Sequence, residues 1–308
     1  MVVFTNWSIT KLLTSLNKNG IFWIWYLTEM SQVVSSTNDR WSSGFEKVAT
    51  YAISNCDVYG VTQLAGRIFV VCDLSNVIRI YDTELQLLNV SITVAGLQYP
   101  SDLVACKSCG PACLYVSDYS DKIWRLVSRP TINKNEEIFY ERLFAEIPAF
   151  SLSVSVDSRL LVIGKDLTVY NPFTGFIDVT NLATFGIQKA RHALKTSSGR
   201  LILCLDTGPV EVDSLRLGKA YGNFNQTSRN RRKTEFSYLA LGGRNEELLL
   251  AADVENRRVV QFEIGSGRQR DLLSTEGGIQ PQRLNFELDT GILVVGMTGS
   301  RIDLYRLK

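Results

Sequence analysis

The single histidine of the chain, His192, limits the chemistry that the sequence can support. A catalytic triad or a metal centre that needs several histidines is excluded. His192 lies at the start of a predicted strand, and the equivalent positions of the other internal repeats carry Asp102, Ser151, Tyr238 and Arg283, with Tyr59 or Gly60 in the remaining repeat. If these strands surround one channel, their side chains form a polar ring at its mouth. Such a ring could hold a small ligand or a peptide terminus, or only water and bonds among its own members.

Three of the six cysteines, Cys106, Cys109 and Cys113, lie close together with C-x₂-C-x₃-C spacing. Three thiols could bind zinc with a fourth ligand, but none is near in the sequence. In an oxidising compartment, Cys113 could instead pair with Cys106 or Cys109 across a hairpin. We expect reduced structural cysteines here, and we expect Cys72 and Cys204, on predicted strands, to be buried thiols that act as small hydrophobes.

One basic run, Arg229, Arg231, Arg232 and Lys233, lies in the connection before the fifth repeat. It could hold the phosphates of RNA or serve as an import signal. Charged loops are mostly only solvated. RNA binding is therefore an alternative and not the preferred hypothesis.

An aspartate follows the second strand in four repeats, at Asp73, Asp118, Asp206 and Asp253. These carboxylates could form a row of metal ligands on one face. Asn or Asp three residues later, as in Asp253 and Asn256, is typical of a tight turn in which the aspartate accepts backbone N–H groups. We favour the turn and expect neither a metal nor a cofactor.

The composition is that of a globular chain that can bury a large core. It has 308 residues, 45% of them apolar, and its net charge of +2 does not by itself indicate nucleic acid or an acidic membrane. No apolar run approaches the ~20 residues that span a bilayer. Residues 21–27 could be the core of a poor signal peptide, and sequons at Asn6, Asn89 and Asn225 would permit glycosylation after secretion. We favour a cytoplasmic over a secreted location.

An internal repeat predicts the fold. A hairpin of two apolar strands, seen in 248–263, recurs with starts near residues 68, 113, 160, 201, 248 and 292, which are 41 to 47 residues apart. That period, with about four short strands per repeat, is typical of a β-propeller. Predicted inner strands precede the hairpins at 101–106, 150–156, 191–196, 236–241 and 282–288. We predict an all-β, six-bladed propeller of four-stranded antiparallel blades over residues 44–308, preceded by a poorly ordered extension, 1–43.

The last repeat has only three strands before the chain stops at Lys308. A blade without its outer strand would expose a sheet edge and leave the ring of blades open. Residues 45–53 have strand character and no partner nearby in the sequence. We predict that this N-terminal strand completes the C-terminal blade.

Parts of the repeats resemble the NHL repeat. Leu97 to Pro100 followed by SDLVAC, then LYVSD and IWRL, has its pattern, as does AADVENRRVVQFE. The blades that begin near Pro100 and Phe236 resemble it best, and blades three and four depart from it. The resemblance, to NHL-type propeller proteins of invertebrates and to the propeller of tripartite-motif proteins, implies a six-bladed scaffold that binds proteins or RNA.

We therefore expect a monomeric, non-catalytic recognition module for a protein partner. The tripartite-motif members deliver a ubiquitin ligase, but this sequence has neither paired zinc ligands nor heptads for such a role. A second alternative is a hydrolase like the six-bladed lactonases and esterases, which hold Ca²⁺ at a central site. The ring offers one good carboxylate, Asp102, opposite a cation, Arg283, and this is a poor site for a divalent ion.

Overall fold

Turn residues separate the strands as their chemistry requires. The computed structural model describes residues 44–54, 56–109, 113–130, 137–213, 216–220, 234–243, 246–275 and 278–308. Within them Ala65 and Gly66, which join the first two strands of the first repeat, have φ of 52° and 71°. Two positive values are what a type I′ hairpin turn needs, and its twist matches that of the strands. The predicted extension, 1–43, lies outside the described residues.

The strands form six antiparallel sheets of four strands each within one compact unit, Phe45–Arg306. The innermost strands of the sheets are β2 (Val58–Leu64), β6 (Pro100–Cys106), β10 (Ser151–Val154), β14 (His192–Lys195), β18 (Phe236–Gly242) and β22 (Pro281–Glu287). The second strands are β3 (Arg67–Cys72), β7 (Cys113–Asp118), β11 (Leu160–Ile163), β15 (Leu201–Leu205), β19 (Leu248–Asp253) and β23 (Ile292–Met297).

The outer half of each sheet follows the same order. The third strands are β4 (Val77–Tyr81), β8 (Lys122–Pro130), β12 (Leu167–Tyr170), β16 (Gly208–Asp213), β20 (Arg258–Glu263) and β24 (Arg301–Leu307). The outermost strands are β5 (Leu87–Thr93), β9 (Glu137–Ala145), β13 (Ile177–Thr180), β17 (Arg216–Ala220), β21 (Gln269–Ser274) and β1 (Phe45–Ala52). The helix in the described part of the chain is a 3₁₀ turn, η1 (Leu182–Phe185), and no helix there has the length and apolar content to cross a membrane.

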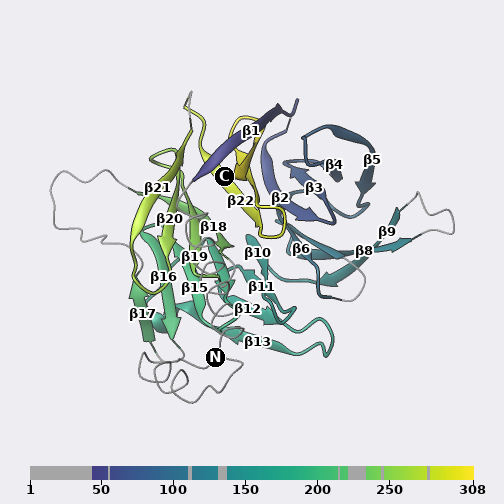
Figure 1. Ribbon diagram of the computed structural model, residues 1–308. Helices are drawn as coiled ribbons and strands as arrows, with labels where there is room; N and C mark the ends of the chain where they lie inside the picture. Colours follow the sequence, from purple (N-terminus) through teal and green to yellow (C-terminus); the bar gives the residue numbers. More distant parts are fainter. Residues whose placement is uncertain are drawn as a thin grey trace, which may run out of the picture. The chain divides into compact units, whose positions relative to one another are not determined.

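The innermost strands make a closed ring. Each contacts the innermost strand of the next sheet, and β22 contacts β2. In Figure 1 β2, β6, β10, β18 and β22 gather in the middle of the view, and β5, β9, β13, β17 and β21 lie toward its edge. Six apolar clusters fill the spaces between neighbouring sheets. The predicted all-β, six-bladed propeller is confirmed.

Two predicted inner strands are longer than the observed ones. The predictions 150–156 and 191–196 correspond to β10 and β14, which have four residues each. Hydroxyl groups end both strands early. Ser155 Oγ accepts the Arg159 N–H at 3.1 Å, and Thr196 Oγ1 accepts the Arg200 N–H at 3.0 Å. Each side-chain bond takes the place of one backbone bond at the hairpin turn, while the N–H groups of Ser155 and Thr196 still donate to the carbonyl oxygens of Arg159 and Arg200 at 2.9 Å.

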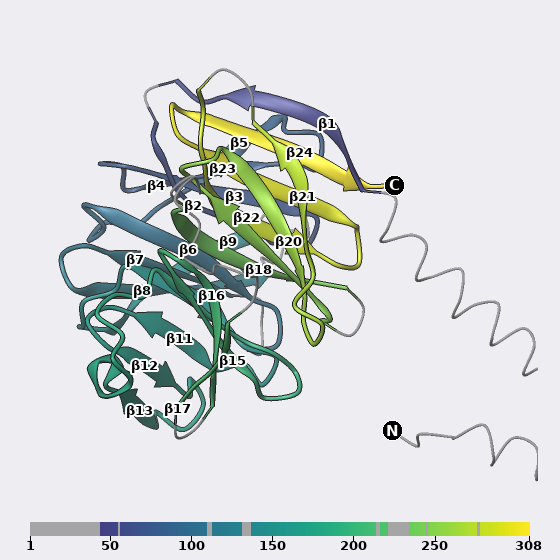
Figure 2. The ribbon, with the colours of Figure 1, turned by 90° about the vertical axis from the view of Figure 1, so that its left-hand side faces the viewer.

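The N-terminal strand completes the last sheet as predicted. The strand order is β1-β24-β23-β22, and Figure 2 shows β1 lying along β24. Asp303 on β24 is fully buried and accepts hydrogen bonds from Thr50 Oγ1 and Lys47 Nζ of β1, both at 2.9 Å. Burial alone would raise the pKa of Asp303, but bonds from Arg301, Lys47 and Thr50 lower it below its usual value. The carboxylate of Asp303 is therefore charged, and its bonds to Lys47 and Thr50 hold β1 against β24.

We expect the substitution Tyr51→Ala in β1 to destabilise the protein by about 2 kcal/mol. The Tyr51 ring packs on the first core cluster and lies 5.2 Å from the ring centroid of Tyr81. The control Val48→Ala removes an exposed side chain from the same strand and should change the free energy of unfolding by less than about 0.5 kcal/mol. Urea unfolding of both variants measures the difference. Equal effects would contradict a packed closing strand.

Candidate functional site

The structure brings the five predicted ring residues, Asp102, Ser151, His192, Tyr238 and Arg283, to the starts of the innermost strands. Each comes from a different sheet: β6, β10, β14, β18 and β22. We call this set the polar ring. Its residues meet because equivalent positions of six repeats face one axis. Whether it binds a ligand remains a prediction.

Asp102 is the centre of the polar ring. Its carboxylate is fully buried and accepts the Leu152 N–H at 2.8 Å, the Leu103 N–H at 2.8 Å and the Ser151 hydroxyl at 3.1 Å. The Tyr238 hydroxyl lies 3.2 Å from both carboxylate oxygens. Burial raises the pKa of Asp102, although these bonds and the charge of Arg283 favour its anion.

His192 is buried beside Tyr238, with ring centroids 3.8 Å apart. Its Nε2 lies 3.1 Å from the Leu152 carbonyl oxygen, which can only accept, so Nε2 carries the proton. Nδ1 is buried without a hydrogen-bond partner among the described residues. Burial lowers the pKa of His192 to about 3, and the charge of Arg283 acts in the same direction. His192 is therefore neutral at physiological pH.

Arg283 connects the polar ring to the first sheet. Its Nε donates to the Tyr59 carbonyl oxygen at 2.6 Å, and Nη2 donates to the Ser101 carbonyl oxygen at 3.0 Å. The guanidinium carbon lies 5.3 Å from the Tyr238 ring centroid, and Nε lies 3.7 Å from an Asp102 oxygen. The guanidinium of Arg283 is therefore held by carbonyl oxygens, the carboxylate of Asp102 and the aromatic face of Tyr238.

Gly60 takes the sixth equivalent position, and the reason is close packing. A Cβ at Gly60 would lie 2.5 Å from the Leu103 backbone nitrogen, so any side chain there would force β2 and β6 apart. The sequence left Tyr59 and Gly60 as alternatives. The structure uses both: Gly60 allows the close approach, and Tyr59 supplies the carbonyl oxygen that Arg283 binds.

Three of the four aspartates that follow the second strands, Asp118, Asp206 and Asp253, serve turns or ion pairs. Asp118 accepts the Ser120 N–H at 2.8 Å and the Gln98 N–H at 2.7 Å. Asp253 accepts the Asn256 N–H at 3.2 Å and pairs with Arg258 at 2.9 Å. Asp206 pairs with Arg191 at 2.6 Å. These contacts favour the turn interpretation over a shared ion.

The expectation of reduced cysteines is wrong for two pairs. Cys56 is bonded to Cys72, and Cys106 to Cys109. Cys72 is therefore not a free thiol. The pairing of β2 with β3 brings Cys56, which lies just before β2, beside Cys72 at the end of β3. Cys113 does not pair across the hairpin; Cys113 and Cys204 are buried free cysteines. Burial raises the pKa of the Cys204 thiol.

The sequence did not reveal an exposed group of aromatic side chains on the face where the innermost strands begin. Tyr99, Tyr119 and Phe150 are each 48% exposed. Tyr119 lies 6.3 Å from the partly buried ring of Tyr59 and 6.2 Å from that of Phe150, measured between centroids. We call these four residues the aromatic row. Each stands at or next to a strand end, and that position was the only signal in the sequence.

The basic run, Arg229, Arg231, Arg232 and Lys233, lies outside the described residues. Its proposed contact with RNA therefore stays a prediction. Three aromatic residues near it in the sequence could stack on bases: Tyr221 and Phe224 also lie outside the described residues, and Phe236 is fully buried.

Comparison with known proteins supports the propeller fold and does not identify a family or a function. No protein-family model and no curated protein sequence matches the chain. Among solved structures, it is similar to streptogramin B lyase, with 11% identity and a TM-score of 0.57 over 87% of this chain and 99% of that one. It is also similar to the β-propeller domain of Cps50 (Swd1) from Myceliophteria thermophila, with 11% identity and a TM-score of 0.55 over 82% of this chain and 83% of that one. Identities this low carry the propeller fold alone.

We expect His192 to make the protein acid-sensitive. Because its pKa falls from 6.5 to about 3 on folding, the unfolded chain binds its proton first. The contribution of His192 to the free energy of unfolding is fully present above about pH 6.5. It falls by about 1.4 kcal/mol per pH unit as the pH is lowered toward 3. Within the polar ring, Tyr238 packs on the His192 ring and the charge of Arg283 acts on it. No other histidine contributes, because the chain has one.

The measurement is the free energy of unfolding in urea at about pH 7 and pH 5 for the wild type and for His192→Gln. Between these values the wild type should lose about 2 kcal/mol more than the variant. Parallel losses in the two proteins would show that His192 is not buried in its neutral form.

Proposed function

We propose that this chain is a non-catalytic recognition module of the NHL type that binds a protein partner. The observation that carries the proposal is the aromatic row on the face where the innermost strands begin. Three of its members, Tyr99, Tyr119 and Phe150, expose about half of their side chains to solvent. Exposed aromatic side chains that lie together are enriched at protein interfaces.

The aromatic row is supplied by neighbouring sheets. Tyr59 lies on β2, Tyr99 and Tyr119 flank β6 and β7, and Phe150 precedes β10. The Tyr119 N–H donates to the Tyr99 carbonyl oxygen at 2.8 Å, which holds the two segments together. Rigid sheets thus present loop residues in fixed positions, the usual arrangement of a binding surface on a stable scaffold.

The contacts of the polar ring favour binding at the face above it. The carboxylate of Asp102 already accepts hydrogen bonds from Ser151, Leu152 and Leu103, and Arg283 is held by two carbonyl oxygens. A ligand in the ring would have to replace these bonds. The aromatic row needs no such exchange. The NHL-like pattern in the blades near Pro100 and Phe236 supports the same assignment.

Two other functions predict different results. An RNA-binding propeller, including one that selects targets for a ubiquitin ligase, should retain single-stranded RNA with a steep salt dependence. A propeller hydrolase of the lactonase or esterase type should bind Ca²⁺ tightly or hydrolyse aryl esters and lactones. Either result with the wild-type chain would replace the recognition module as its function.

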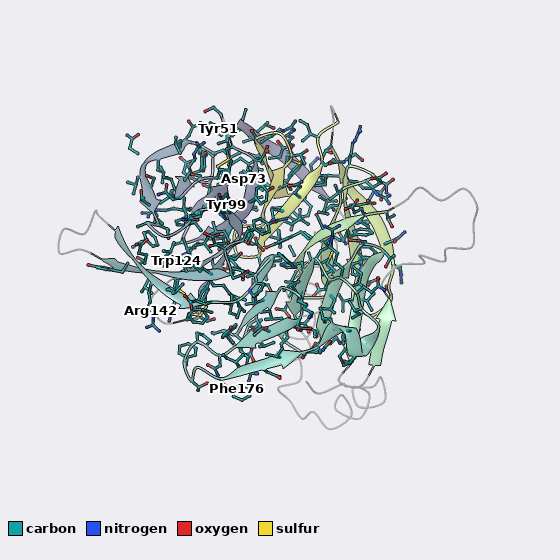
Figure 3. All side chains as sticks on the ribbon, turned by 180° about the vertical axis from the view of Figure 1, so that it is seen from behind. Tyr51, Asp73, Tyr99, Trp124, Arg142 and Phe176 are labelled. Carbon is teal, nitrogen blue, oxygen red and sulfur yellow. A yellow bond between two sulfur atoms is a disulfide. The ribbon has the colours of Figure 1, made fainter. Side chains whose placement is uncertain are left out.

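We expect the double substitution Tyr119→Ser/Phe150→Ser to weaken partner binding without unfolding the protein. Loss of two exposed aromatic contacts should weaken a specific interaction by at least about tenfold. Phe176→Ser is the matched control, because Phe176 is also exposed and lies far from Tyr99 and Asp73 in Figure 3.

The measurement is capture from an extract of the source organism, followed by titration of each purified captured protein. Melting curves test whether the variants fold. A partner whose affinity is unchanged by the double substitution, or is reduced as much by Phe176→Ser, would contradict binding at the aromatic row.

A further inference from the structure

The carboxylates of Asp57 and Asp73 lie near Tyr59 of the aromatic row. The Asp73 N–H donates to the Asp57 carbonyl oxygen at 2.9 Å, so the residues that precede β2 and follow β3 lie together. Burial and the charges of Asp73, Tyr119 and Asp57 raise the pKa of the Tyr59 hydroxyl. Both carboxylates therefore lie within electrostatic reach of the row. Asp57 is exposed and Asp73 is half-buried.

The positive charge of Arg283, which acts on Tyr59, is already bound. Arg283 acts on Tyr59 in the opposite direction to the aspartates, but its guanidinium donates to the carbonyl oxygens of Tyr59 and Ser101 and lies beside Asp102. Its side chain is only 14% exposed. Arg283 therefore neutralises Asp102 beneath the surface, and the charges of Asp57 and Asp73 face solvent.

These features select among possible ligands. Aromatic faces attract cations, and carboxylates strengthen the attraction. A purely apolar partner would remove water from Asp57 and Asp73 without replacing it, and a phosphate would be repelled. We propose that the aromatic row binds a lysine or arginine side chain of the partner protein, with the cation beside Asp57 and Asp73 and its alkyl stem on the rings of Tyr59 and Tyr119. This inference rests on the proposed function.

The test uses random dodecapeptides displayed on phage, selected on the wild-type protein, with affinities of synthetic peptides measured by calorimetry. We expect selected sequences to be enriched in Lys or Arg. Replacing the basic residue of a selected peptide by norleucine, or using Asp57→Asn/Asp73→Asn, should each weaken binding by about tenfold. The two changes together should be less than additive.

Asp289→Asn is the matched control, because Asp289 is exposed in the turn after β22, at the opposite end of an innermost strand. It should change affinity by less than about twofold. Peptides that need Tyr119 but contain no basic residue, or that ignore the aspartate changes, would refute the cation site and leave the recognition face standing. Failure to select any peptide whose binding needs Tyr119 would refute both.

A second inference comes independently from the cysteines of the second sheet. Cys106 at the end of β6 and Cys113 at the start of β7 are directly opposite in the strand register. The Sγ atoms of Cys106, Cys109 and Cys113 all lie within 4.8 Å of one another. Opposite residues of antiparallel strands have Cα separations of about 4.5–5.5 Å, within the range of a disulfide. A Cys106–Cys113 bond therefore fits without moving the strands.

A neighbouring cation distinguishes disulfide exchange from metal binding. The Arg125 guanidinium donates to the Cys109 carbonyl oxygen at 3.2 Å. Burial raises the pKa of Cys113, and a hydrogen bond from Arg125 and its charge oppose that shift. A positive side chain favours a thiolate and disfavours a bound metal cation. Burial leaves the pKa of Cys113 above its usual value, so its thiolate forms mainly at alkaline pH, where the charge of Arg125 partly offsets the cost of burying it.

We infer that Cys113 exchanges with the Cys106–Cys109 disulfide. The Cys113 thiolate attacks Cys106 Sγ, a Cys106–Cys113 bond forms, the Cys106–Cys109 bond breaks, and Cys109 leaves as a thiolate that takes up the proton given up by Cys113. No electron enters or leaves the protein. The exchange moves the cross-link from the turn to the strand pair and frees the thiol of Cys109.

The test holds the native wild-type protein at about pH 9, quenches it with acid, and maps disulfides by peptic digestion and mass spectrometry. We expect both the Cys106–Cys109 and the Cys106–Cys113 linkages, the second forming more slowly at about pH 7 because less thiolate is present. Cys204, buried in another sheet, is the internal control, since any linkage to it would reveal scrambling. A single Cys106–Cys109 linkage at both pH values, with no trace of Cys106–Cys113, would overturn the inference.

Discussion

One buried carboxylate, that of Asp102, holds the middle of the molecule together. An unpaired charge in this position would be strongly unfavourable, because the carboxylate is fully buried. Besides the N–H of Leu103 in its own strand, the groups that compensate it come from other sheets: Ser151 and Leu152 from the third, Tyr238 from the fifth and, more distantly, Arg283 from the sixth. Innermost strands as short as β10 and β14 offer few ladder bonds of their own. Bonds between side chains of different sheets therefore fix how these sheets sit around the axis, and the position of the aromatic row above them depends on the same bonds.

Ring closure uses the same physical means at the outer edge. Asp303 is a second buried carboxylate, and its partners Lys47 and Thr50 belong to the first strand of the unit. Closure of the last sheet could be predicted because three strands and an unpaired edge require a fourth. The hydrogen-bonding carboxylate could not be predicted, because Asp303 reads in the sequence as an ordinary polar position of an alternating strand. Its burial follows only when β1 covers it.

The repeat predicted much of the architecture and the membership of the polar ring, because equivalent residues of each repeat occupy equivalent radial positions. It could not predict how these residues bond. That Asp102 takes backbone donors from the next sheet, and that Arg283 reaches the carbonyl oxygen of Tyr59, depends on distances between sheets. The cysteines show the same limit. Cys56 lies before a strand and has no pattern of its own, and only the register of β2 against β3 brings it to Cys72. A low cysteine content did not exclude disulfides.

The aromatic row, where we propose that a partner binds, lies outside the repeat pattern. Tyr99, Tyr119 and Phe150 adjoin strands without contributing to the alternation that makes strands recognisable, so no periodicity marks them. Binding free energy can come only from groups that gain contacts when a partner arrives. The charged groups of the polar ring, Asp102 and Arg283, already have partners, and a ligand that bonded to them would break existing bonds. When a partner binds, half-exposed aromatic rings beside solvent-facing carboxylates break few existing contacts. The rings gain apolar burial, and the carboxylates gain a paired charge. A scaffold whose core is held by its own sheets can vary its surface residues freely, and aromatic area exposed beside solvent-facing carboxylates is where we propose that a partner binds.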